Sequence, residues 1–312
     1  MKIRFWGVRG SVPSPLRPSR LRSKISSAIE RIGASDIESQ DSRELFLSRL
    51  PEYLFSTVGG NTACVEMVTG EKQRIIFDAG TGIRELGDEI RVSREPADCR
   101  IFFSHFHWDH IQGLPFFSPA FDARNSLHFY SPVADFRSVL EGQMREPYFP
   151  ITMDAMTASK EWHRLSGESV RLGGVEVRYR LMNHPGGCYS YRVEEGGVKV
   201  LYATDTELTQ ADFEKTPENS AYFAGVDAII IDTQYTLGEA IEKYNWGHSS
   251  FSLAADFAST WGIKRLILFH HEPVNSDRKI ESILKNAAWY IEHLEGNGIE
   301  VILAREGLEL EV

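Results

Sequence analysis

The chain repeats one local pattern, in which a short apolar run rich in β-branched residues ends in a cluster of polar side chains. The pattern occurs in QRIIFDAGTG, CRIFFSHFHWDH, VKVLYATDTE, VDAIIIDTQY and KRLILFHHEP. Short unbroken apolar runs are typical of buried strands, and functional groups gather on the loops that leave such strands. The repetition therefore predicts a sheet system in which several strand ends meet at one edge and form a site.

The stretch HFHWDH places four side chains of the metal-binding type within six positions. His105 and His107 alternate, so both would point the same way on an extended segment, and Asp109 shares their parity. His110 follows directly and needs a turn to converge with them. Imidazole suits zinc, manganese and iron, and a carboxylate can hold a second, harder ion. This density of ligands, directly after an apolar strand, predicts a metal site.

A complete metal site needs donors from elsewhere in the chain, and the other strand ends supply candidates. These are His184 in LMNHPGG, Asp205 in LYATDTE, and His270 or His271 in LILFHHEP. Each is weak evidence alone, but together they share the position after a strand. Asp78 in IIFDAGTG and Asp232 in IIIDTQY are expected behind the site, since metal-bound histidines usually donate their free N–H to a carboxylate or carbonyl.

The composition restricts the partners of such a site. The net charge of −10 argues against a general grip on nucleic acid, which needs clustered Lys and Arg. A small phosphorylated substrate is compatible with this charge, because bound dications reverse the local sign. No apolar run approaches the ~20 residues that cross a bilayer, and MKIRFWGVRG lacks the apolar region of a secretory signal. The scattered Cys64, Cys99 and Cys188 fit reduced thiols, so we expect a cytoplasmic protein with no membrane partner.

The 312 residues, 42% of them hydrophobic, can bury one large core, and we expect a single domain over residues 1–312. Residues 16–54 are rich in Ser and charge, but Ile25, Ile29 and Ile32 carry helical spacing. We interpret this segment as a helical insertion. It would serve as a lid over the site or as a dimer contact, and its proximity to the VRGS loop favours the lid. Further helices are expected over residues 135–146, 249–261 and 280–294, the last stopping at Gly296.

The HxHxDH form of HFHWDH, followed by Gly113, resembles the metallo-β-lactamase-fold hydrolases. The order of the later elements is similar too: a histidine, an aspartate and a final histidine, each after a strand. The resemblance covers nearly the whole chain and is weakest over residues 16–54. It implies an α/β fold, the four-layer αββα sandwich of that superfamily, with the helical insertion near the N-terminus.

Within that superfamily the chain resembles the phosphodiesterase branch, which includes ribonuclease Z and cyclic phosphodiesterases. The likeness is carried by WGVRGSVPSP, GGNTACVEM, HPGG and above all WGHSS, which resembles the HST loop of ribonuclease Z. The long basic arm with which ribonuclease Z grips tRNA has no counterpart in EEGGVKV. Bulk nucleic acid is therefore not expected as a partner. The expected substrate is a small phosphodiester, such as a cyclic nucleotide or a cyclic phosphate.

The resemblance also implies two divalent metal ions, with zinc expected and manganese or iron as alternatives. One ion would be held by His105, His107 and His184, and the other by Asp109, His110 and His270, with Asp205 bridging both. His270 is preferred to His271 because it directly follows the LILF strand, where the family places its last ligand. The oligomeric state stays open, and a homodimer is one alternative because this fold often dimerises.

Three residues are candidates for the chemistry of a dinuclear metal-dependent hydrolase. Asp109 would orient the attacking hydroxide and accept its proton. His248, in WGHSS, would donate a proton to the leaving alkoxide, and Glu207 would support it if the two side chains pair. The alternative is that His248 merely precedes a helix cap at Ser249 or Ser250.

Other functions stay open at this point. A lactone, thioester or β-lactam hydrolase of the same fold would use the same metals without needing His248. A metal-dependent sensor that binds a nucleotide without turnover is a second alternative, although an intact ligand set argues against it. A structural metalloprotein is disfavoured, because structural zinc sites are usually thiolate-rich and closed.

Overall fold

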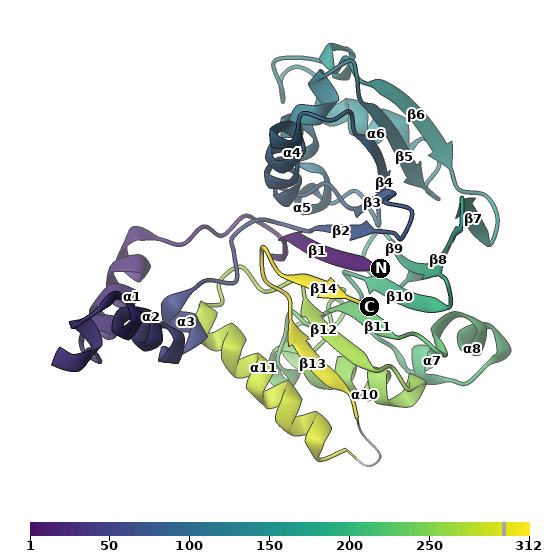
Figure 1. Ribbon diagram of the computed structural model, residues 1–312. Coiled ribbons are helices and arrows are strands. Elements are labelled where there is room, and N and C mark those ends of the chain that lie inside the picture. Colours follow the sequence, from purple (N-terminus) through teal and green to yellow (C-terminus); the bar gives the residue numbers. More distant parts are fainter. Residues whose placement is uncertain (295–297) are drawn as a thin grey trace.

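Two β-sheets packed face to face form the centre of the molecule (Figure 1). The computed structural model describes residues 1–294 and 298–312, and within these residues each sheet has seven strands. The first sheet contains, in spatial order, β14 (Glu309–Glu311), β1 (Lys2–Gly7), β2 (Cys64–Val68), β3 (Arg74–Phe77), β4 (Asp98–Phe102), β5 (Ser126–Ser131) and β6 (Ser159–Arg164). The second contains β13 (Glu300–Leu303), β12 (Arg265–Phe269), β11 (Ala228–Asp232), β10 (Val198–Ala203), β9 (Cys188–Glu195), β8 (Val175–Met182) and β7 (Ser169–Leu172).

Helices cover the outer faces of both sheets (Figure 1). The first sheet packs against α4 (Gly82–Ser93) and α6 (Phe136–Gln143), and the second against α10 (Phe251–Trp261) and α11 (Asp277–Glu292). Shorter elements are α5 (Trp108–Ile111), α7 (Gln210–Phe213), α8 (Pro217–Phe223), α9 (Leu237–Glu242) and the 3₁₀ turns η2 (Leu114–Phe116), η3 (Ser118–Phe121) and η4 (Met153–Ala155). The predicted four-layer αββα sandwich is confirmed.

The central strands are buried on both faces, which explains their unbroken apolar runs. In β3, Phe77 packs between the sheets, where its ring lies 5.1 Å from that of Tyr202 in β10. The preceding Ile76 faces α4 instead. Alternate residues of one strand thus belong to two different apolar layers, and a polar residue on either side would face a core.

The strand directions bring the polar strand ends to one edge of the sandwich. Strands β3 to β6 are mutually parallel, as are β10 to β13. The carboxyl ends of parallel strands lie at the same edge of a sheet, so the loops that leave them are neighbours. HFHWDH leaves β4, and Asp205 and His270 leave β10 and β12. The repeated sequence pattern thus gathers at one edge.

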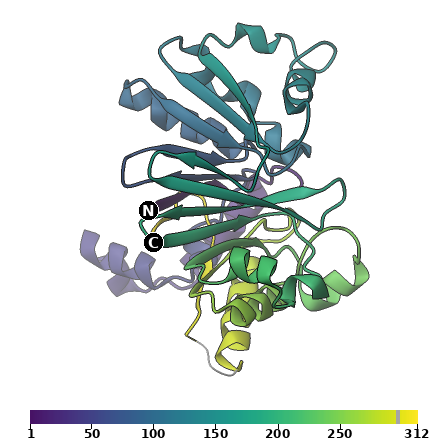
Figure 2. The same ribbon diagram turned by 90° about the vertical axis from the view of Figure 1, so that its right-hand side faces the viewer.

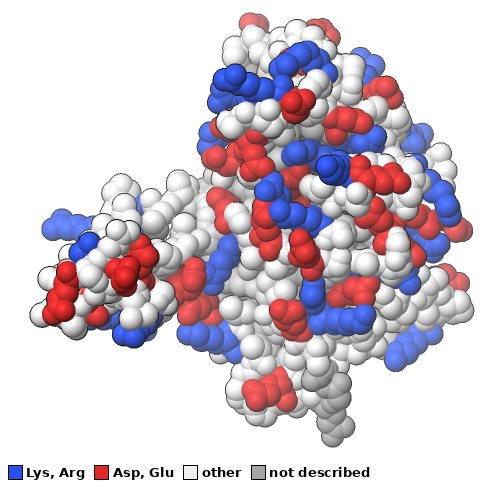
Figure 3. All heavy atoms as spheres, viewed as in Figure 1, with Lys and Arg blue, Asp and Glu red and all other residues white. Residues whose placement is uncertain are grey.

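Residues 16–54 form a helical arm that projects from the side of the sandwich (Figures 1 and 3). The arm contains α1 (Pro18–Ile29), η1 (Ala34–Ile37) and α2 (Gln40–Arg49), and α3 (Glu52–Phe55) returns the chain to the body. None of these helices has a buried residue. The arm is anchored by Lys24, whose ammonium pairs with Asp277 at the start of α11, and by Tyr53, whose backbone N–H donates to Glu281 at 3.0 Å.

The other expected helices are present with shifted ends. The helix expected over residues 249–261 is α10, capped by Ser250 and terminated by Gly262 in the left-handed conformation. The helix expected over residues 135–146 is the shorter α6. The one expected over residues 280–294 is α11, which begins at Asp277 and ends at Glu292. The expected stop at Gly296 lies outside the described residues.

The termini lie side by side (Figures 1 and 2), because β1 and β14 pair antiparallel. The Met1 amino group donates to the Val312 carbonyl at 3.0 Å.

All three cysteines are buried and free, as expected of core thiols. Across residues 1–294 and 298–312, no helix is both long and apolar enough to span a bilayer.

Candidate metal centre

Four loops bring the seven expected metal ligands together. HFHWDH leaves β4, and α5 turns the chain so that Asp109 and His110 face the same space as the two histidines before them. His184 follows β8, Asp205 follows β10, and His270 follows β12. The seven residues form two groups, and within each group the ligand atoms lie within 4.8 Å of one another.

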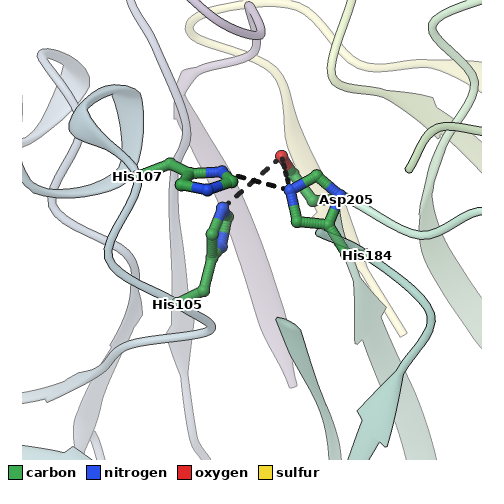
Figure 4. Close-up of side chains that lie close together, drawn as sticks. All are labelled: His105, His107, His184 and Asp205. Carbon is green, nitrogen blue, oxygen red and sulfur yellow. Dashed lines mark hydrogen bonds and ion pairs between the residues drawn. The ribbon is translucent and has the colours of Figure 1, made fainter. Parts of the chain in front are cut away.

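The first group consists of His105, His107, His184 and Asp205, whose side chains point toward one another (Figure 4). His107 Nδ1 lies 3.1 Å from His184 Nε2. Asp205 Oδ2 lies 3.7 Å from His105 Nε2 and 3.8 Å from His184 Nε2. Three imidazole nitrogens and one carboxylate oxygen thus surround a single point.

The second group consists of Asp109, His110, His270 and the same Asp205. The other oxygen of Asp205, Oδ1, lies 3.1 Å from Nε2 of both His110 and His270. Asp109 Oδ2 lies 3.3 Å from the same two nitrogens. Asp205 therefore presents one carboxylate oxygen to each group, which is the geometry of a bridging ligand.

The outer nitrogens of four histidines are occupied by hydrogen bonds that fix how each ring is turned. The Nδ1 atoms of His105, His110, His184 and His270 contact Ser104 Oγ, Asp78 Oδ2, the Gly247 carbonyl and Gln234 Oε1, at 3.0, 2.8, 2.8 and 3.1 Å. A neutral imidazole has one donor and one acceptor nitrogen, so these bonds leave the Nε2 lone pairs aimed at Asp205. A cation held between these acceptor nitrogens and the carboxylate would satisfy both sides.

Two buried ring nitrogens in the centre are left without a hydrogen-bond partner in the described part of the chain. Nε2 of His105 and Nε2 of His110 have no hydrogen-bond partner among the described residues. A tetrahedral ion with ligand bonds of about 2.0–2.2 Å separates its ligand atoms by about 3.3–3.6 Å. The contacts around Asp205, 3.1 to 3.8 Å, fall around that spacing. The donor set therefore fits two divalent ions.

Burial and neighbouring charges shift the pKa values of several groups within the centre. Burial alone would raise the pKa of Asp205, but His110 and His270 hold it well below its usual range. Burial opposes a charge on His110 as well, yet Asp205 and Asp109 raise the pKa of that ring well above its ordinary value. His105 is different: burial and the neighbouring His110 lower its pKa. The buried carboxylates thus stay ionised and favour positive charge beside them, supplied either by a proton on His110 or by a bound cation.

Asp78 supports the centre from behind. Its Oδ1 accepts the Ser104 backbone N–H at 2.7 Å, and its Oδ2 accepts Ser104 Oγ, His110 Nδ1 and Tyr202 Oη at 2.7 to 2.8 Å. Asp78 is fully buried and has a positive φ of 62°. The carboxylate therefore fixes both the start of HFHWDH and the orientation of one ligand ring, as expected from the strand-end position of Asp78.

His248 lies at the edge of the centre and pairs with Asp232. Its Nδ1 donates to Asp232 Oδ2 at 2.6 Å, and its ring stacks on that of His270 with centroids 5.1 Å apart. A separation of 2.6 Å leaves no room for an ion between the two atoms, since ligand atoms of one ion lie about 3.3 Å apart or more. Burial would lower the pKa of His248, but Asp232 outweighs it and raises the pKa to about 9.

His248 and Glu207 do not pair, so the condition under which Glu207 would support the ring is not met. The Glu207 carboxylate accepts the backbone N–H groups of Asn245 and Gly247 at 3.0 and 2.9 Å. It thereby holds the loop that carries His248, while Asp232 reaches the ring. Both carboxylates follow apolar strands, so their positions in the sequence alone do not distinguish these roles. His248 also lies shortly before Ser250, which caps α10, as the alternative reading of this residue expected.

His271 faces away from the centre. Its Nε2 contacts the Ala304 carbonyl at 2.9 Å, and burial lowers its pKa to about 3. His270, by contrast, has a φ of 58°, and this left-handed conformation turns its ring into the centre. The expected choice between the two histidines thus agrees with the geometry: His270 joins the ligand group, and His271 stabilises the fold.

Two glycines allow close approach to the ligand rings. A Cβ on Gly10 would lie 2.4 Å from the His270 ring, and one on Gly247 would lie 2.3 Å from His184 Nδ1. Gly247 also has a φ of +87°, which disfavours other residues. The WGHSS loop therefore positions a ligand histidine as well as His248.

Three supporting residues are missing from the sequence-based set. The backbone N–H of Ser11 donates to Asp109 Oδ2 at 2.7 Å, Gln234 contacts His270, and the Gly247 carbonyl accepts from His184. Gln234 stands in the strand end IIIDTQY, so the repeated pattern could have identified it. The other two act through backbone atoms, which carry no side-chain signal in a sequence.

A cavity of about 420 Å³ opens over the ligands. It is lined by Ser11, Phe106, His107, Trp108, Asp109, Asp205 and His248. Trp108 stands at its rim with 80% of its surface exposed. The described lining includes no residue of the helical arm, which instead borders a separate cavity of about 870 Å³ beside α11. The structure thus does not place the arm as a lid over the centre.

Known proteins share this architecture. A family model described as the beta-lactamase superfamily domain matches residues 73–271. Ribonuclease Z of Synechococcus sp. (strain CC9605) is 23% identical over 258 residues, which cover 64% of this chain and 76% of that protein. The metallo-beta-lactamase fold protein YhfI from Bacillus subtilis has a TM-score of 0.65 and 15% identity, covering 99% of this chain and 98% of the other. A diphosphatase of the PhnP family has a TM-score of 0.64 and 17% identity, covering 100% and 97%.

The expected resemblance to the metallo-β-lactamase-fold hydrolases, and within them to ribonuclease Z, is confirmed by the family match and by the ribonuclease Z match. The family match spans more than half of the 312 residues and contains HFHWDH, His184, Asp205 and His270. The chain belongs to the beta-lactamase superfamily.

Proposed function

We propose that the protein is a dinuclear phosphodiesterase that acts on a small phosphodiester, such as a cyclic nucleotide or a cyclic phosphate. The observation that carries this proposal is the placement of Asp205, which offers one oxygen to each of two ligand groups. Paired ions are typical of phosphoryl-transfer sites, where they contact the attacking and the leaving oxygen.

In this proposal His105, His107 and His184 hold one ion, and Asp109, His110 and His270 hold the other. Zinc fits the imidazole-rich donor set, and manganese or iron would fit it as well. When bound, the two ions supply hydroxide from water near neutral pH and stabilise negative charge on the phosphoryl oxygens.

The chain's own residues then handle the protons. Asp109 lines the cavity, and its Oδ2 is held by the Ser11 backbone N–H, so this carboxylate can orient the attacking nucleophile. His248 lines the same cavity with its Nδ1 fixed on Asp232. This leaves Nε2–H as the group that can protonate a leaving alkoxide. Glu207 contributes indirectly, by holding the loop that bears His248.

The size and lining of the cavity support a small substrate. Its volume of about 420 Å³ lies in the range of small-molecule sites. The exposed Trp108 at the rim can stack against a nucleobase, an interaction that tolerates any base. Two similar proteins are named ribonuclease Z and diphosphatase, and both names denote enzymes that act on phosphate esters or anhydrides.

A substrate panel tests the proposal. Protein loaded with zinc or manganese should hydrolyse bis(p-nitrophenyl) phosphate, and one or more cyclic nucleotides should be turned over in the same assay. Protein stripped by a chelator is the matched control and should be inactive. Loaded protein that leaves every phosphodiester intact but opens a lactone or a β-lactam would replace this proposal with the second hydrolase class.

A further inference from the structure

A second group of metal-binding side chains lies away from the centre, on strands β5 and β6. The two strands are parallel, with His128 opposite Glu161 and Tyr130 opposite His163. Side chains two apart on a strand share one face, so His128, Glu161 and His163 stand on the same side of the sheet. Strand β6 is the edge strand of the first sheet (Figure 1).

The three ligand atoms form a nearly equilateral triangle. His128 Nδ1 lies 3.3 Å from His163 Nε2 and 3.4 Å from Glu161 Oε2, and the latter two atoms are 3.5 Å apart. Zinc bonded to nitrogen and oxygen at about 2.0–2.2 Å in tetrahedral geometry separates its ligands by about 3.3–3.6 Å. The triangle therefore has the edge lengths of one face of a zinc tetrahedron.

The arrangement behind His128 matches a metal-bound histidine. Its other ring nitrogen, Nε2, lies 3.1 Å from Asp98 Oδ1, and Arg100 holds the second oxygen of that carboxylate at 2.9 Å. Metal-ligating histidines commonly donate their free N–H to such a carboxylate, which fixes the tautomer and leaves the opposite nitrogen as a ligand. With Nε2 donating to Asp98, the Nδ1 lone pair of His128 points into the triangle.

The other histidine is held by ring packing. The His163 ring stacks on Tyr130 with centroids 4.5 Å apart and planes 12° from parallel. The side chains of His128, His163 and Glu161 are 18%, 36% and 60% exposed, so the fourth corner of the tetrahedron opens to water. This corner of the sheet thus presents two imidazoles, one carboxylate and an open position, which is a His₂Glu ligand set.

We propose that His128, His163 and Glu161 bind one zinc ion that clamps the edge strand β6 to β5. The site shares no residue with the dinuclear centre. Its supporting Asp98 begins β4, whereas HFHWDH follows the end of that strand. The ion would hold the two strands through side chains as well as through their backbone ladder. The inference does not depend on the phosphodiesterase proposal.

The number of bound ions tests the inference. Chelator-treated protein is reloaded with excess zinc, desalted and measured by metal analysis, for the full-length chain and for His163→Ala. The variant should hold one ion fewer per chain, with unchanged hydrolysis of bis(p-nitrophenyl) phosphate. His293→Ala is the matched control, because His293 is an exposed histidine stacked on Trp289 outside every described ligand group, and it should bind as many ions as the parent chain.

A second variant guards against loss of folding. Glu161→Gln alters the most exposed ligand and keeps both histidines, so it should fold as the parent does by circular dichroism. It should lower zinc affinity at this site by about tenfold or more in a cobalt or zinc titration. Equal ion counts in the parent chain and His163→Ala would overturn the inference and leave the proposed function standing. If His163→Ala held one ion fewer but neither protein hydrolysed any phosphodiester, the zinc site would stand and the proposed function would fall.

Discussion

The Nδ1 atom of His248 lies 2.6 Å from Oδ2 of Asp232, and this contact directs the other ring nitrogen toward the cavity above the ligand groups. The Asp232 carboxylate is itself held by the backbone N–H groups of Thr206 and Gln234 at 3.3 and 3.0 Å. A carboxylate that is fixed by backbone donors positions the imidazole and favours its charged form.

Replacing His248 by alanine should therefore separate substrates by leaving group. A poor leaving alkoxide needs a proton, so kcat for a cyclic nucleotide should fall by ~10²–10⁴. The p-nitrophenolate leaving group needs no proton, so bis(p-nitrophenyl) phosphate should lose far less. Steady-state kinetics on both substrates measure the difference. Equal losses on both, at unchanged metal content, would rule out a proton donor at this position.

A change at Asp78 should weaken the metal centre from behind. In Asp78→Asn an NH₂ group would replace one of the two accepting oxygens and face a donor in either orientation. That donor is the Ser104 backbone N–H at the Oδ1 position, or the set Ser104 Oγ, His110 Nδ1 and Tyr202 Oη at the Oδ2 position. We expect a loss of about 1–3 kcal/mol in stability and about 10–100-fold in metal affinity. Denaturant unfolding and metal competition with a chelator measure the two effects.

The matched control for that change is Tyr202→Phe. It removes one hydrogen bond to Asp78 and leaves the contacts to Ser104 and His110 in place. It should cost about 1 kcal/mol of stability with little change in metal affinity. If both variants reduced metal affinity equally, the orientation of His110 would not be the reason.

The sequence predicted those site residues that directly follow strands. It did not predict hydrogen-bond partners that are brought together only by tertiary contacts. HFHWDH, Asp205 and His270 stand directly after apolar runs, so both their elements and their convergence could be inferred. The partner of His248 could not be inferred in this way. Asp232 and Glu207 both follow apolar strands, and only the folded loops show which of the two carboxylates reaches the ring. The proximity of His128 and His163 could not be predicted either, because it depends on the register of β5 and β6.

The arm shows the same limit for the fold. Helical spacing within residues 16–54 predicted its helices, but its position depends on contacts with distant residues. Asp277 accepts from Thr57 Oγ1 and the Val58 N–H at 3.0 and 3.1 Å and pairs with Lys24. Its neighbour Arg9 is buried, donating to the carbonyls of Gly59, Glu272 and Asn275. The sequence around Asp277 and Arg9 does not predict these contacts, because the partners are distant in the chain.

Asp277→Ala should consequently loosen the arm. The change removes the anion that holds Lys24 and leaves the Val58 N–H without its acceptor, at a cost of about 1–3 kcal/mol. Trypsin should then cleave the arm faster in the folded protein, as followed by gel electrophoresis over time. Glu38→Ala removes an exposed carboxylate from the same arm and should leave the cleavage rate unchanged. Cleavage of Asp277→Ala at the parental rate would place the anchor elsewhere.

The buried thiol of Cys99 should make stability fall at alkaline pH. Burial raises its pKa to about 12 from an ordinary value of 9.0. Between these values the unfolded thiol loses its proton while the folded thiol keeps it, so the unfolded state binds fewer protons and stability declines as pH rises. The contribution is complete below about pH 9, and its slope is at most about 1.4 kcal/mol per pH unit.

Comparison with Cys99→Ala isolates this effect from the other groups that ionise at high pH. Urea unfolding at pH 8 and pH 10 should show a smaller loss of stability in the variant than in the parent chain. The same burial predicts that iodoacetamide at pH 8 labels Cys99 only after unfolding, because the thiolate is the reactive form and the folded thiol is inaccessible. Labelling of the folded protein at the rate of the unfolded chain would show that this side of β4 opens to solvent.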